Sequence, residues 1–125
     1  MEDARIGPIN DIIFNKADEF AREVYRETFT FPKEELYGVT SQLRRAVLSV
    51  PLNITEGYAR ISMQDHRRFL EISYGSLKEV KYLLYFSLQQ KYISSKTYEM
   101  CIEKSEELCR MLWRKINTIR AKTQK

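Results

Sequence analysis

Apolar residues recur every three or four positions along most of the chain, which is the spacing of a helix with one buried face. Short polar or proline-containing connectors divide this pattern into four runs. The first run follows Asn10, a residue type that caps helix N-termini, and we expect it to end near Glu27. Its apolar positions are Ile13, Ala17, Phe20, Ala21 and Val24.

The second run begins after Pro32, a residue favoured at the first position of a helix, and continues through Pro51. The phase of its apolar stripe does not change at Pro51, so the pattern predicts one helix, kinked at the proline. We expect this helix to close between Gly57 and Ile61. The stripe comprises Leu36, Val39, Leu43, Val47, Val50 and Ile54.

The third run starts at Ser62, which stands three residues before Asp65 in a capping-box-like arrangement, and should end near Gln90. The fourth run follows a cap at Ser94 or Ser95. The two stripes comprise Phe69, Ser73, Leu77, Val80, Leu84 and Leu88, and Tyr98, Cys101, Ile102, Leu108, Cys109, Leu112, Ile116 and Ile119. Residues 1–125 are therefore predicted to form a single all-α domain, an up-down-up-down antiparallel four-helix bundle.

Two of the predicted helices carry apolar residues outside their core stripes. Leu48 and Leu52 fall on the opposite side of the second helix from Leu43. Tyr82 and Phe86 likewise point away from the stripe of the third helix. Apolar residues that cluster on adjacent helices commonly mark a subunit interface. These residues therefore predict that the chain forms a homo-oligomer.

A polar face follows the second helix in steps of three or four residues, and the third helix offers polar partners for it. In an antiparallel hairpin, Arg45 should approach the turn at residues 76–79, and Glu56 and Asn53 should approach residues 65–68 at the start of the third helix. Ala46 and Gly75 should let the two backbones approach closely. We interpret this seam as a structural ion-pair network; the alternative is a ligand-binding site. The seam comprises Arg45, Asn53, Glu56, Ser76 and Glu79.

The net charge of +4 is unevenly distributed along the chain. Residues 1–35 carry nine acids and five bases, so the rest of the chain carries a net charge of +8. Residues 110–125 contain six bases and no acid. Arginine can bond two phosphate oxygens at once, so the clustered cations are a candidate nucleic-acid-binding surface; the alternative is a solvated face. The candidate contacts are Arg44, Arg60, Arg67, Arg68, Arg114, Lys115, Arg120 and Lys122.

The residue types offer little for catalysis or for a cofactor. His66 is the only histidine, is expected to be exposed, and lacks the Glu-x-x-His partner of a di-metal site. No glycine-rich phosphate loop is present. Cys101 and Cys109 should lie about 12 Å apart along one helix, too far to bridge each other. We therefore expect a non-enzymatic protein without a metal or a cofactor.

The N-terminal segment MEDARIGPIN lacks the basic start and the apolar core of a secretory signal. The longest strongly apolar run, YLLYF, is far shorter than the roughly 20 residues that span a bilayer. We expect a cytoplasmic protein that is not inserted in a membrane.

Three segments, FPKEELYGVTSQLRRA, NITEGYAR and RRFLEISYGSLKE, occur in this order. Together they resemble the bacterial four-helix-bundle family encoded within intervening sequences of 23S rRNA genes, over about residues 10–95. The resemblance implies an up-down bundle that assembles as a ring, typically a homopentamer, with no established enzymatic activity. Thr55 and Ser73 stand where that family would be expected to have alanine.

A related family, the accessory proteins of diversity-generating retroelements, uses a similar basic pentamer to bind a reverse transcriptase and RNA. The resemblance and the charge pattern together support two hypotheses. The first is a homo-oligomer that binds nucleic acid, RNA or DNA, with structured RNA as the favoured ligand. The second is a ring-shaped scaffold that binds a nucleic-acid-processing protein such as a reverse transcriptase.

Overall fold

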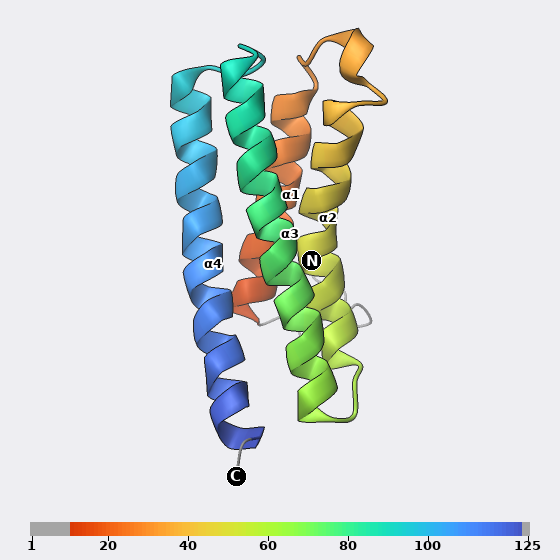
Figure 1. Cartoon of the computed structure of the whole chain (residues 1–125), viewed down its shortest axis with the longest axis vertical. Helices are drawn as coiled ribbons and strands as arrows, with labels where there is room; N and C mark the ends of the chain where they lie inside the picture. The colour runs from red at the N-terminus through yellow and green to blue at the C-terminus, as the bar shows by residue number, and fades with distance from the viewer. Residues whose placement is uncertain (1–10, 124–125) are drawn as a thin grey trace.

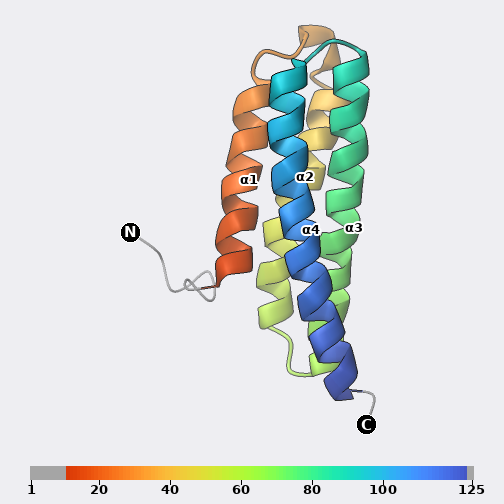
Figure 2. The ribbon, with the colours of Figure 1, turned by 90° about the vertical axis from the view of Figure 1, so that its left-hand side faces the viewer.

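The computed structural model describes residues 11–123, which form four α-helices and one short 3-10 helix, and no strand within that range. The elements are α1 (Ile12–Thr28), η2 (Lys33–Glu35), α2 (Val39–Tyr58), α3 (Met63–Gln89) and α4 (Ser95–Thr123). Successive α-helices run in opposite directions (Figure 1). Each α-helix packs on its neighbours in chain order, and α1 also packs on α4 (Figure 2). The predicted antiparallel four-helix bundle is confirmed.

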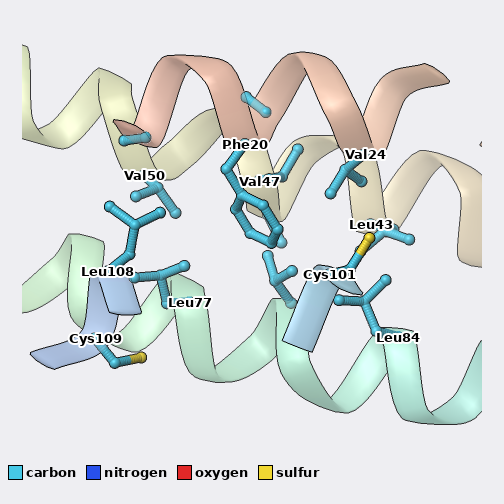
Figure 3. Close-up of a cluster of buried hydrophobic side chains, with 14 of the residues drawn as sticks. Phe20, Val24, Leu43, Val47, Val50, Leu77, Leu84, Cys101, Leu108 and Cys109 are labelled. Carbon is cyan, nitrogen blue, oxygen red and sulfur yellow. The ribbon is translucent and has the colours of Figure 1, made fainter. Parts of the chain in front are cut away.

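The core is built from the predicted apolar stripes. In Figure 3, Phe20 of α1 lies among side chains from all three other α-helices. The most deeply buried large side chains are Phe20, Val24, Leu43, Val47, Val50, Ile54, Leu77, Leu84, Leu108, Leu112, Ile116 and Ile119. Tyr98 and Ile102 are only half-buried and pack at the margin of this cluster. The four stripes therefore meet along one common axis.

Side-chain caps fix the first turn of three α-helices. Asp11 caps α1 by accepting a hydrogen bond of 2.8 Å from the backbone N–H of Phe14, and the predicted cap Asn10 lies outside the described residues. Ser62 caps α3 as predicted, because its hydroxyl accepts from the N–H of Asp65 at 3.0 Å. Ser94, whose hydroxyl accepts from a backbone N–H in the first turn, caps α4.

The helix after Pro32 begins later than predicted. Pro32 precedes the short helix η2, and α2 begins only at Val39. The Glu35 carboxylate accepts a hydrogen bond of 3.2 Å from the N–H of Val39, so it satisfies a free backbone donor at the start of α2. Leu36 consequently lies in the connector, where it is 49% exposed, although its position fits the phase of the apolar stripe.

α2 continues through Pro51, as the unbroken apolar phase predicts. Two hydroxyls donate to backbone carbonyls beside the proline: Thr55 Oγ1 to Pro51 O at 2.9 Å, and Ser73 Oγ of α3 to Val50 O at 2.8 Å. Thr55 and Ser73 are the two positions where the related sequences would be expected to have alanine. Their hydroxyls are therefore satisfied by this stretch of α2 and are not unpaired in the core.

Candidate nucleic-acid interface

Seven of the eight predicted nucleic-acid contacts belong to one end of the bundle. This end comprises the connector between α2 and α3, the first turns of α3 and the last turns of α4, which lie together in both views (Figures 1 and 2). We call it the basic end. Its cations are Arg60, Arg67, Arg68, Arg114, Lys115, Arg120 and Lys122.

One carboxylate joins the two helices of the basic end. Glu71 Oε2 lies 3.3 Å from Arg120 Nη2 of α4 and 3.8 Å from Arg67 Nε of α3. Arg67 Nε is buried and has no hydrogen-bond partner among the described residues. A single acid therefore holds two cations in place without neutralising both, and the pair keeps a net positive charge.

Arg60 is held against an aromatic ring. Its guanidinium lies 4.5 Å from the centre of the Phe69 ring, and its Nε donates to the carbonyl oxygen of Glu56 at 3.3 Å. A cation and an aromatic ring are thus in direct contact at this turn. Arg68, on the next helix, is exposed and takes part in no ion pair with residues 11–123.

The eighth candidate, Arg44, lies at the opposite end of the bundle. Its guanidinium lies 4.9 Å from the ring centre of Tyr25 and 5.2 Å from that of Phe29. Arg44 Nε also donates to Thr28 Oγ1 at 2.9 Å. These contacts tie α2 to the C-terminal end of α1, so Arg44 is a structural residue and not part of the basic end.

The turn that presents the basic end is tightly built around a buried histidine. His66 Nδ1 donates to the carbonyl oxygen of Gly57 at 2.9 Å, and the imidazole and the Tyr58 ring pack in a T-shaped arrangement with 5.0 Å between their centres. A Cβ on Gly57 would lie 3.3 Å from Phe69 Cβ and 3.4 Å from the His66 carbonyl oxygen. The expectation of an exposed His66 is therefore wrong, because the ring caps the end of α2.

Tyr58 extends this arrangement to α1. Its hydroxyl donates to the Asp11 carboxylate, which also caps α1. The turn between α2 and α3 is thereby fixed to a third helix.

The predicted seam between α2 and α3 is held by hydroxyls and an amide. Ser49 Oγ lies 2.8 Å from Ser76 Oγ. Asn53 Nδ2 donates to Ser49 O at 2.8 Å and to Ser49 Oγ at 2.9 Å. Asn53 therefore supports the Ser49–Ser76 contact. The expectation that Asn53 would approach the start of α3 is wrong, because its amide bonds to its own helix instead.

The ion pairs predicted for the seam do not form. Arg45 and Glu79 line the same shallow hollow of about 500 Å³, but the described residues contain no ion pair between them. The Glu56 carboxylate likewise has no hydrogen bond or ion pair with residues 11–123. A Cβ on Gly75 would meet open space, so Gly57 and not Gly75 is the glycine of close approach. The expected ion-pair network is wrong in these details.

Three of the four predicted interface residues are exposed, two on α2 and one on α3. The exposed fractions are 45% for Leu48, 56% for Leu52 and 62% for Tyr82. Phe86 is half-buried and packs near Tyr82, with 6.5 Å between ring centres. Exposed apolar side chains on two adjacent helices are typical of a surface that packs against a partner.

The described residues offer little acid–base or metal chemistry. Burial raises the pKa of the Cys101 thiol to about 11, with Glu27 and Glu23 adding to the effect, and burial also raises the pKa of Cys109. Neither thiol is therefore activated as a nucleophile. Residues 11–123 contain no group of three or more His, Cys, Asp and Glu side chains placed to hold a metal ion. None of the described helices has the length and apolar character needed to cross a membrane.

One group of residues that could bind nucleic acid was missed in the sequence. It lies between α3 and α4 and combines aromatic with basic side chains. The residues from each helix recur in steps of three or four along the sequence, so each set shares one helix face. The contact between the two sets arises only when α3 packs on α4, which the spacing does not show. The residues are Tyr74, Lys78, Lys81, Arg110 and Trp113.

The sequence and the fold were compared with known proteins. The profile of the family described as "23S rRNA-intervening sequence protein" matches residues 10–114. A similar fold occurs in a crystal structure of a protein of unknown function from the S23 ribosomal protein family of Bacteroides thetaiotaomicron. That protein is 24% identical, with a TM-score of 0.76, and the match covers 84% of this chain and 98% of the other. No curated protein matches the sequence.

Proposed function

Because the chain belongs to the family of 23S rRNA-intervening sequence proteins, we propose that it is a non-enzymatic homo-oligomer whose basic end binds RNA. The family name associates these proteins with rRNA genes, which favours RNA over other polyanions. The proposal places the oligomer in the cytoplasm.

The observation that carries the proposal is the charge of the basic end. Residues 56–71 and 110–123 together hold eight bases and three acids. Glu71, one of those acids, already contacts two of the bases. The surplus of positive charge is therefore available to phosphates, which attract Arg and Lys without regard to base sequence.

Oligomerisation would multiply this charge. The exposed apolar surface of Leu48, Leu52 and Tyr82 supports self-association, and the family resemblance favours a ring of five subunits. Symmetry would repeat the basic end once per subunit around an axis. Several weak contacts to one RNA would then add up to strong binding.

The test is RNA binding by the purified full-length chain, followed through the anisotropy of a labelled RNA. Replacing four cations of the basic end by alanine should weaken binding at least tenfold, since each lost phosphate contact removes counterion release. A matched control removes four exposed cations elsewhere and should bind nearly as well as the parent. The test variant changes Arg114, Lys115, Arg120 and Lys122, and the control changes Arg22, Arg26, Lys33 and Lys96.

An equal loss of RNA affinity in the two variants would show that binding depends only on the net charge of the protein. The basic end would then not be the binding site. No binding by the parent protein, together with stable capture of a reverse transcriptase or similar polypeptide, would favour the scaffold hypothesis.

A further inference from the structure

A groove between α3 and α4 leads toward the basic end. It forms a hollow of about 250 Å³. Trp113 and Arg120 are two helical turns apart on the same side of α4, so the groove points toward the ion pair of Arg120 with Glu71. The lining side chains used below are Tyr74, Lys78 and Lys81 of α3, and Glu106, Arg110 and Trp113 of α4.

The two aromatic rings form a platform and not a clamp. The centres of the Tyr74 and Trp113 rings lie 5.6 Å apart, with 39° between the ring planes. Ring centres at this separation belong to two rings in direct contact, so no base fits between them. Lys78 Nζ lies 5.2 Å from the centre of the Tyr74 ring and occupies that side. Trp113, which is 48% exposed, is therefore the ring open to a ligand.

The charge of the groove suits a phosphate backbone. Lys78, Lys81 and Arg110 face a single acid, Glu106. None of these four side chains joins an ion pair within the part of the chain that the structure describes. The three cations also act together on the thiol of Cys109, where they oppose the effect of burial on its pKa.

We propose that this groove binds unpaired nucleotides of a single-stranded RNA, with one base stacked on Trp113 and the phosphates beside the three groove cations. Exposed aromatics flanked by cations are the usual surface for single strands, because every base has a face that can stack. The inference rests on the proposed RNA binding and adds both a site and a preference for unpaired strands.

Two other occupants fit the groove less well. The hollow is smaller than the roughly 300–1,000 Å³ of small-molecule pockets. In a duplex, the bases are stacked on each other, so none of them can lie on the indole ring. An exposed aromatic with unpaired cations therefore matches a single strand better than either a metabolite or a double helix.

Trp113 is the only tryptophan of the chain, so its fluorescence reports on this groove alone. We would titrate the full-length protein with a single-stranded RNA of about 12 nucleotides, and with its duplex, while recording indole emission and the anisotropy of labelled RNA. The single strand should quench Trp113 over the concentration range in which anisotropy rises, and the duplex should quench much less.

The variant Trp113→Ala should bind the single strand at least about fivefold more weakly, whereas Trp113→Phe should keep most of the affinity. Tyr37→Ala is the matched control, because Tyr37 is an exposed aromatic residue outside the groove. The variant Lys78→Ala with Lys81→Ala should weaken binding without changing the indole emission of the free protein.

The outcomes separate the two proposals. A rise in anisotropy with unchanged Trp113 emission, or equal affinity of Trp113→Ala and its parent, would overturn the groove while RNA binding stands. No anisotropy change with either RNA at about 50 mM salt would overturn RNA binding itself. Dissociation of the oligomer by Trp113→Ala, seen by light scattering, would assign the groove to a subunit contact and overturn the inference.

Discussion

Ser49 of α2 and Ser76 of α3 place their hydroxyl oxygens 2.8 Å apart where the two helices with the most extensive contact in the bundle meet. Asn53 lies one helical turn after Ser49 and donates to the hydroxyl and the carbonyl oxygen of Ser49. Two short side chains can form this hydrogen bond in only one alignment of the helices. The contact therefore fixes the register of α2 against α3.

The first prediction compares the effect on stability of replacing Asn53 and of replacing Glu56, two polar residues of α2. Asn53→Ala should lower the free energy of unfolding by about 1 kcal/mol, because two hydrogen bonds are lost and the gain in helix propensity offsets only part of that cost. Glu56→Ala should change it by less than about 0.5 kcal/mol, since the Glu56 carboxylate makes no contact that would be lost. Urea denaturation measures both, and equal losses would contradict the described seam.

The second prediction compares two glycines. Gly57→Ala should destabilise the protein by about 1 kcal/mol, because the new Cβ would lie only 3.3 Å from Phe69 Cβ of α3, at a cost larger than the gain in helix propensity. Gly75→Ala should stabilise it by about 1 kcal/mol, since its Cβ would meet open space. Thermal and denaturant unfolding of the two variants should therefore move in opposite directions. Stabilisation by both would show that the α2–α3 turn is looser than described.

The third prediction concerns pH. The hydrogen bond from the Tyr92 hydroxyl, together with that from the Val39 N–H, lowers the pKa of Glu35. A lowered folded-state pKa gives stability that is present above the unfolded value of about 4.3 and is lost as the pH falls through the folded value. The stability difference between the parent and Glu35→Gln should therefore be constant near neutral pH and shrink below about pH 4.

The neighbouring variant Glu34→Gln supplies the control for this measurement, since Glu34 is exposed and bonds neither Tyr92 nor Val39. If the stability difference from the parent changed with pH in the same way for both variants, the hydrogen bonds to Glu35 would not lower its pKa.

The fourth prediction concerns assembly. Replacing Leu48 and Leu52 by glutamate should dissociate the oligomer while circular dichroism still reports a full helical content, because both side chains lie outside the core. The same change at Ile12 and Ile61, exposed apolar residues of α1 and of the connector after α2, should leave the oligomer intact. Light scattering that finds the same mass for the parent and the first variant would remove this surface as the interface.

The fold was predictable because burial repeats with the period of a helix. The second stripe is buried as predicted from Val39 to Ile54, and the fourth is buried except for Tyr98 and Ile102, which are half-buried. The start of α2 was not predictable in the same way, since Leu36 fits the phase of the stripe but the Glu35 bond to Val39 begins the helix later. Periodicity assigns a residue to a face and does not say where a helix begins.

The candidate site was only partly predictable for a related reason. The cations of α4 could be grouped from the sequence because no acid interrupts them. Arg44 has the same chemistry, yet its partners Tyr25 and Phe29 come from another helix and hold it at the other end. The bond between His66 and Gly57 likewise depends on the geometry of a turn, which helical spacing does not contain.

The most direct test of the account is the salt dependence of RNA binding by the intact oligomer. Each neutralised phosphate of a single strand contributes about −0.7 to the slope of log K against log salt, so several contacts per assembly give a steep fall in affinity between about 50 and 200 mM. We predict such a fall, with a shallower slope once Arg114, Lys115, Arg120 and Lys122 are replaced together. Binding that is undetectable at about 50 mM salt, or that does not change up to about 200 mM, would contradict the claim that the basic end binds RNA.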